Sequence, residues 1–139
     1  MATRNKSYPS SPGFVVDPKR IVRNTGRQID WSLVTAGATY GVAGSRVLKA
    51  GTVVSEVTAT GKVVPRALGA AGTGSSTGIL ETAAHENSES DSLSGYGVIK
   101  GGGIFANRLP DAADAAFATM QTELGARFYF ETANDTRAS

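Results

Sequence analysis

Three consecutive glycines, Gly101 to Gly103, interrupt an apolar stretch that runs from Tyr96 to Phe105. Glycine weakens a strand, because it loses more backbone entropy on folding than other residues and packs no side chain. The cluster therefore predicts a bulge, a sharp bend or a close approach of another backbone segment. It does not match the Gly-x-Gly-x-x-Gly pattern of a dinucleotide site, so the structural interpretation is favoured.

The residues around this cluster predict a small β-rich fold. Residues 52–58 are rich in β-branched side chains, which favour strands, and a turn with Gly61 leads into a return strand that Pro65 ends. Pro110 suits the first turn of a helix and Gly125 suits its end. Four apolar residues give that helix one stripe: Ala113, Phe117, Met120 and Leu124. The expected strands are 52–58, 63–64, 78–84, 96–100 and 126–132, and the expected class is α+β with one main helix near the C-terminus.

The beginning of the chain differs from the rest and predicts an extended N-terminal arm over residues 1–35, ahead of a β-rich domain at 36–139. Pro9, Pro12 and Pro18 lack a backbone donor and favour extended chain. Phe14, Val15 and Val16 form an apolar island among them, which is either an anchor for a partner or a segment that folds back onto the body. Removal of residues 1–35 is therefore expected to leave a folded body.

The end of this arm predicts a strand. Ile29, Trp31 and Leu33 alternate with polar residues, the period of a half-buried strand. Trp31 is the only tryptophan, and it is interpreted either as a core residue or as an interface anchor, since tryptophan is enriched among interface hot spots.

Charge is unevenly placed along the chain. Residues 1–30 contain six Lys or Arg residues against Asp17 and Asp30, a net of +4, so the remainder carries −2 of the total +2. A basic arm on a mildly acidic body indicates docking to an acidic surface, such as nucleic acid or a protein shell. A solubilising tail explains the same charge equally well. No nucleic-acid reader motif accompanies the arm, so direct nucleic-acid binding is not expected.

The sequence offers little for catalysis, metals or membranes. Its one histidine, His85, lies in a polar stretch without a nucleophile elbow, and there are no cysteines. Gly61-Lys62 lacks both the earlier glycine and the following Ser or Thr of a phosphate loop. No apolar run approaches the ~20 residues that span a bilayer, and the N-terminus lacks the apolar region of a signal peptide. We expect no enzyme, no cofactor and no membrane association.

Several short strings, in their order and spacing, resemble the head decoration (capsid cement) proteins of tailed phages, the phage lambda decoration protein family. The resemblance covers roughly residues 36–132. The strings are Gly51-Thr52-Val53-Val54, Gly61-Lys62-Val63-Val64, Gly78-Ile79-Leu80, Ala83-Ala84, Val98-Ile99-Lys100, Gly103-Ile104-Phe105 and Leu109-Pro110-Asp111-Ala112-Ala113. The arm has no string that aligns with the family.

The resemblance implies a structural protein without catalysis or cofactor. It implies homotrimers at three-fold and quasi-three-fold sites on the outer surface of an icosahedral virion head, made in the host cytoplasm. The partner is the major capsid protein, bound after the shell expands, and the role is to stabilise the shell against the pressure of packaged DNA.

Within this interpretation the arm is expected to bind the capsid by adding a strand to an exposed edge of the shell protein, a mode in which main-chain hydrogen bonds provide affinity. The candidate residues are Phe14, Val15, Val16, Arg20, Arg23, Arg27, Ile29, Trp31 and Leu33. Two alternatives remain at this point. One is another virion part, such as a tail or baseplate component, and the other is a ligand-binding β domain with loops 69–77 and 85–95 at its binding edge.

Overall fold

The computed structural model describes residues 13–68, 76–88 and 95–133. It confirms the α+β, β-rich class, with one α-helix in the described part, α2 (Phe117–Leu124), near the C-terminus. The main sheet contains β1 (Val22–Arg27), β3 (Val53–Glu56), β4 (Val63–Pro65), β5 (Ser76–Leu80), β7 (Tyr96–Phe105) and β8 (Phe128–Glu131). A separate two-stranded sheet contains β2 (Val47–Leu48) and β6 (Ala84–His85).

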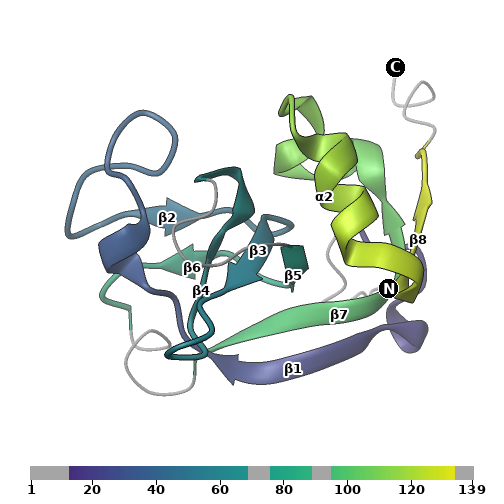
Figure 1. Cartoon of the computed structure of the whole chain (residues 1–139), viewed down its shortest axis with the longest axis horizontal. Coiled ribbons are helices and arrows are strands. Elements are labelled where there is room, and N and C mark those ends of the chain that lie inside the picture. The colour runs from purple at the N-terminus through teal and green to yellow at the C-terminus, as the bar shows by residue number, and fades with distance from the viewer. Residues whose placement is uncertain (1–12, 69–75, 89–94, 134–139) are drawn as a thin grey trace, which may run out of the picture.

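The long strand β7 organises the main sheet (Figure 1). The order β1-β7-β5-β3-β4 is antiparallel throughout, whereas β8 runs parallel to the second half of β7. Strand β5 pairs with β7 in the register Ile79 to Ile99 and Leu80 to Val98, and so joins β3 and β4 to β7 and β1. Short 3-10 turns link these strands: η1 (Pro18–Arg20), η2 (Trp31–Leu33), η3 (Arg66–Leu68), η4 (Ala106–Arg108), η5 (Pro110–Ala113) and η6 (Gly125–Arg127).

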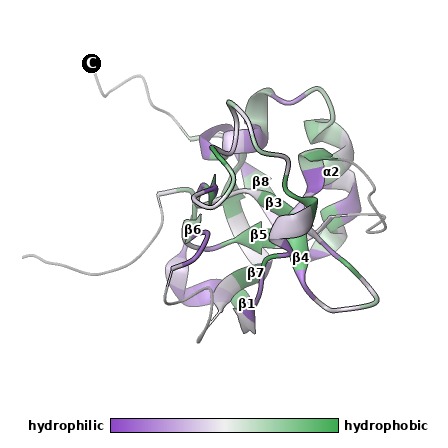
Figure 2. Ribbon diagram, turned by 90° about the vertical axis from the view of Figure 1, so that its left-hand side faces the viewer, coloured by the Kyte–Doolittle hydropathy of each residue, from purple (hydrophilic) through white to green (hydrophobic). Residues whose placement is uncertain are grey.

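Both faces of the sheet are buried, so the molecule has two apolar cores. Neighbouring residues on a strand point to opposite faces, which places Ile79 in one core and Leu80 in the other. The first core also contains Phe14, Val15, Val53, Ile99, Ile104, Leu109, Met120, Leu124 and Phe128. The second contains Ile29, Val34, Leu48, Val54, Val63, Ala84, Tyr96 and Val98. Figure 2 shows hydrophobic colour gathered on β3, β5 and β7 in the middle of the molecule.

The glycine cluster lies where β7 changes partners. Up to Gly101, β7 pairs with β1 and β5, and from Gly102 onward it pairs with β8 and, at Ile104, with Val15. Gly102 has φ +128°, and a Cβ there would lie 2.8 Å from Cγ2 of Ile21. A Cβ on Gly103 would lie 3.1 Å from Cβ of Val16. Close approach of neighbouring chain therefore explains the cluster, as the sequence predicted.

The predicted helix is divided in the structure. Pro110–Ala113 forms only the turn η5, Asp114 is extended at φ −72° and ψ 139°, and α2 begins at Phe117. The Asp114 carboxylate accepts a hydrogen bond from the Ala116 amide at 2.8 Å, which stabilises the break. Met120 and Leu124 are buried as the apolar stripe predicts, whereas Ala113 is exposed, so the continuous helix is corrected to a turn followed by a two-turn helix.

Residues 13–35 pack into the body in the structure. Phe14 and Val15 are only 5% and 6% exposed, and the Phe105 amide donates a hydrogen bond to the Phe14 carbonyl oxygen at 2.7 Å. Strand β1 is part of the main sheet. A boundary at residue 35 would therefore cut the sheet, and removal of residues 1–35 is no longer expected to leave a folded body. Residues 1–12 of the expected arm lie outside the described residues.

The strand expected at Ile29, Trp31 and Leu33 is also corrected. Trp31–Leu33 forms the 3-10 turn η2, because the Asp30 carboxylate accepts hydrogen bonds from the Ser32 amide and hydroxyl at 3.2 and 2.5 Å. Ile29 is 4% exposed and makes an isolated parallel bridge to Val63. Local capping by Asp30 thus overrides the alternating pattern.

Two carboxylates hold segments that are distant in sequence. Glu86 binds the guanidinium of Arg46 at 2.7 Å and accepts hydrogen bonds from the amides of Arg46 and Gly44. Glu123 on α2 binds Arg66 at 2.9 Å and accepts from both the amide and the hydroxyl of Ser76. These arginine hydrogen bonds are the main reason that the pKa of each carboxyl falls from 4.5 to about 2.

Candidate docking surface

Strand β1 forms one edge of the main sheet. It pairs with β7 on one side, and no other strand in the described part of the chain pairs with it (Figure 1). Val22, its first residue, is 63% exposed. The turn η1 precedes β1 and is capped by Asp17, whose carboxylate accepts from the Lys19 amide at 3.0 Å. An edge strand of this kind presents main-chain donors and acceptors to a partner.

The three basic candidates of the arm have different roles. Arg23 donates two hydrogen bonds of 2.9 Å to the Glu81 carboxylate, and Arg27 binds Glu56 at 3.0 Å. These two arginines therefore tie β1 to the body. The Arg20 side chain is 85% exposed and meets Asp17 only at 3.4 Å, a surface contact of little energetic weight. Among the three, Arg20 is the one that projects for docking.

Three of the six apolar candidates are buried and so cannot form an exposed clamp. Phe14, Val15 and Ile29 belong to the two cores. Val16, Trp31 and Leu33 are partly buried, and Trp31 packs against the second core. The structure thus favours the alternative in which the island around Phe14 folds back onto the body, and the core interpretation of Trp31.

Three neighbouring residues remain as the candidate docking surface: Lys19, Arg20 and Val22, together with the open edge of β1. Lys19 and Val22 were not singled out by the sequence analysis. Their signal was present in the string Lys19 to Arg23, where cations flank Ile21 and Val22. Which of two adjacent apolar residues faces outward depends on the register with β7, and that is not a local property of the string.

This surface can do three things chemically. The backbone edge of β1 can accept another strand, Val22 can bury apolar area on contact, and the two cations can orient an acidic partner. Residues 1–12 precede it in the sequence and contain two more cations, Arg4 and Lys6, and no carboxylate side chain. The arrangement suits binding to a protein surface and contains no nucleophile with an adjacent base.

The other chemical possibilities have no structural counterpart in residues 13–68, 76–88 and 95–133. These residues contain no group of three His, Asp or Glu side chains placed to hold a metal ion. None of their helices has the length and apolar character needed to cross a bilayer. The loops proposed for a ligand-binding domain, 69–77 and 85–95, fall largely outside the described residues.

Comparison with known proteins identifies no relative. No family model, no curated protein and no solved structure matches the chain.

Proposed function

We propose that the chain is a capsid decoration protein that binds the outside of an expanded icosahedral phage head. It binds the major capsid protein, forms trimers at the three-fold and quasi-three-fold sites, and stabilises the shell against internal DNA pressure. It has no enzymatic activity and needs no cofactor.

The observation that carries the proposal is where the family-like strings lie in the fold. Gly78-Ile79-Leu80 forms most of β5, and Val98-Ile99-Lys100 lies directly beside it on β7. The strings that begin at Gly51 and Gly61 run into the β3–β4 hairpin next to β5. Strings that are short and separate along the chain therefore occupy neighbouring strands of one sheet, which supports reading them as one pattern.

The docking surface supports the same proposal. Main-chain edge, apolar contact and charge can all contribute to binding a shell, and the exposed side chains of Lys19, Arg20 and Val22 lie at the start of the edge strand β1. Trimers would engage several such surfaces at once, and this multivalency can raise affinity by about 10²–10⁴. A protein that binds only the expanded shell stabilises that state by mass action.

Co-sedimentation with phage heads tests the proposal. The full chain is mixed with expanded and with unexpanded heads of the phage that carries it, and bound copies are counted per shell subunit. We expect saturable binding to expanded heads alone, near one copy per shell subunit. Absence of binding to both forms would reject decoration and leave a tail or baseplate part, or a ligand-binding domain, as the next candidates.

A further inference from the structure

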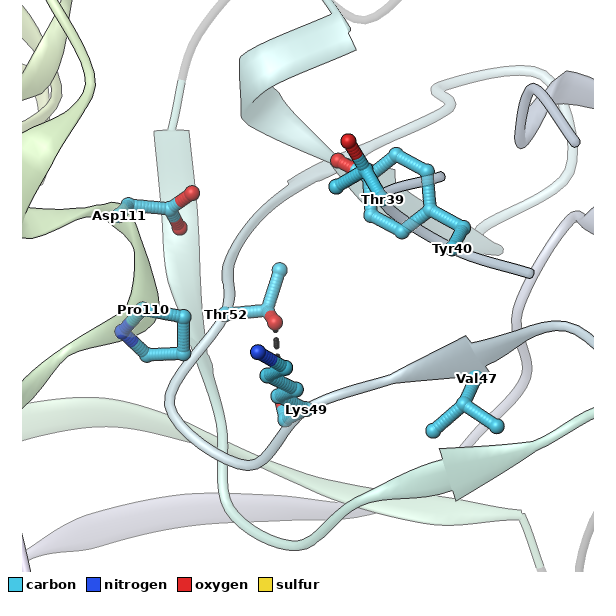
Figure 3. A pocket seen from close by; sticks show the side chains of 7 residues that line it. All are labelled: Thr39, Tyr40, Val47, Lys49, Thr52, Pro110 and Asp111. Atoms are coloured by element: carbon cyan, nitrogen blue, oxygen red, sulfur yellow. Dashed lines mark hydrogen bonds between the residues drawn. The ribbon is translucent and has the colours of Figure 1, made fainter. Parts of the chain in front are cut away.

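A hollow of about 110 Å³ lies between the loop before β2 and the turn η5. Its lining comes from Thr39, Tyr40, Val47, Lys49, Thr52, Pro110 and Asp111. Figure 3 shows the Asp111 carboxylate turned into the space that separates it from Tyr40. A volume of this size holds about three waters, or the end of a lysine or arginine side chain. The lining combines apolar walls, three hydroxyl groups, the Asp111 carboxylate and the side chain of Lys49. Its acceptor oxygens and apolar walls suit the second occupant, an aliphatic stem with a cationic head.

Asp111 is an unusual carboxylate in this protein. Glu86 and Glu123, which are also partly buried, each bind an arginine, whereas Asp111 accepts one hydrogen bond, from the Val53 amide at 2.8 Å. No Lys or Arg nitrogen of the described residues lies within 4.0 Å of its carboxylate, although Lys49 lines the same hollow. Burial, and then the neighbouring Asp114, raise the pKa of Asp111. A cation in the hollow would offset both effects.

The N-terminal segment leaves the described body next to this hollow. The Gly13 carbonyl oxygen accepts a hydrogen bond from Nη1 of Arg108 at 3.0 Å. Pro110, which lines the hollow, and the Phe14 ring both approach Gly51, since a Cβ built there would lie 3.0 and 3.2 Å from them. Extended chain spans at most about 3.3–3.6 Å per residue, so Lys6 can reach roughly 23–25 Å from Gly13. The hollow is within that radius, because Pro110 is two residues from Arg108.

We propose that the hollow is a docking site for a cationic side chain, Arg4 or Lys6, of the chain's own segment 1–12. The segment carries these two cations and no acidic side chain, so its charge complements the carboxylate of Asp111. Attachment to Gly13 keeps its local concentration at the hollow high, in the millimolar range typical of short tethers. Lys49 moderates the attraction, because its ammonium lines the same space. The proposal does not depend on the capsid function.

Limited trypsin digestion of the native full chain tests the site, because trypsin cuts after Arg4 and Lys6. Digestion is compared between the wild type and Asp111→Asn, which keeps an oxygen acceptor for the Val53 amide but removes the charge. The matched control is Asp17→Asn, which makes the same charge change near the segment but away from the hollow. We expect cleavage after Arg4 and Lys6 to be roughly threefold or more faster in Asp111→Asn at low salt, and unchanged in the control. The difference in cleavage rate between the wild type and Asp111→Asn should shrink at about 0.5 M salt, where exposed charges are screened.

The Val53 amide gives a second measurement that does not use protease. Its NMR chemical shift reports on the Asp111 carboxylate, and it should move in a variant with both Arg4→Gln and Lys6→Gln. Equal cleavage rates in wild type and Asp111→Asn, together with an unmoved Val53 signal, would overturn the proposal. Protection that increases with protein concentration would also overturn it, because the occupant would then belong to a second copy.

Discussion

The amide of Phe105 donates a hydrogen bond to the carbonyl oxygen of Phe14 at 2.7 Å. This bond, with the Val16 amide to Gly103 carbonyl bond at 3.0 Å, lays the start of the described chain along the end of β7. The Phe14 ring enters the first core beside Gly51. The chain from Gly13 onward is consequently part of the folded body.

The first prediction separates this core role from a docking role. Phe14→Ala removes a buried ring, and such truncations cost about 3–5 kcal/mol of unfolding free energy. Chemical denaturation of the free protein measures the loss. Removal of residues 1–12, in contrast, should lower the unfolding free energy by at most about 1 kcal/mol, because every core contact described here is kept and only the proposed ion pair with Asp111 is lost. A stable Phe14→Ala variant would contradict the placement of this ring.

The second prediction concerns the glycine cluster. Gly102→Ala would place a Cβ 2.8 Å from Cγ2 of Ile21 and 3.1 Å from the Arg20 carbonyl oxygen, at a φ of +128°. The strain should lower the unfolding free energy by about 2 kcal/mol or more. Gly13→Ala is the control, because no atom lies within 4 Å of a Cβ there, and it should be neutral. Equal melting temperatures of the two variants would show that the segment at Arg20 and Ile21 does not crowd Gly102.

The third prediction is a loss of stability in acid. The folded-state pKa values of Glu86 and Glu123 are about 2, below their ordinary 4.5. Between these values the folded state therefore binds fewer protons at the two groups than the unfolded state does. Their stabilisation is complete above about pH 5 and falls as the pH decreases toward 2. The melting temperature should therefore decrease over this window. A double variant, Glu86→Gln with Glu123→Gln, should melt lower at pH 7 and change less with pH, and a parallel curve would contradict the assignment.

The fourth prediction tests the docking surface against another exposed valine. Val22→Asp should weaken head binding at least tenfold, equivalent to about 1.4 kcal/mol, while leaving the free protein's stability unchanged. Val42→Asp provides a matched control. Val42 lies in the loop before β2 and is 69% exposed, close to the 63% of Val22. Binding curves on expanded heads measure both. If the two variants bind equally well, the β1 edge is not the contact.

Sequence patterns predicted the parts of the fold that depend on neighbouring residues. The β-branched residues around Val53 and Val54 form β3, and the alternation around Phe128 forms β8. Two other parts depend on partners far along the chain. Phe14 is buried where Gly51 and β7 leave room for its ring. The prolines and serines that surround Phe14 in the sequence do not predict this burial.

The candidate site was harder to predict than the fold for the same reason. Arg20, Arg23 and Arg27 look equivalent in sequence, but Glu81 and Glu56 bind the last two and leave Arg20 exposed. At Asp30 and Asp114 a single carboxylate caps a turn and interrupts a regular pattern of strand or helix. Periodicity describes the preference of a segment and does not include such local hydrogen bonds.

The measurement that tests the central proposal most directly is heat-induced release of DNA from filled, expanded heads prepared without this protein. The heads are heated alone and with saturating full-length protein, and release is followed with a DNA-binding dye. The account predicts that the protein raises the release temperature, and that the Val22→Asp variant raises it less at the same concentration. Release at the same temperature with and without bound wild-type protein would contradict a cement function.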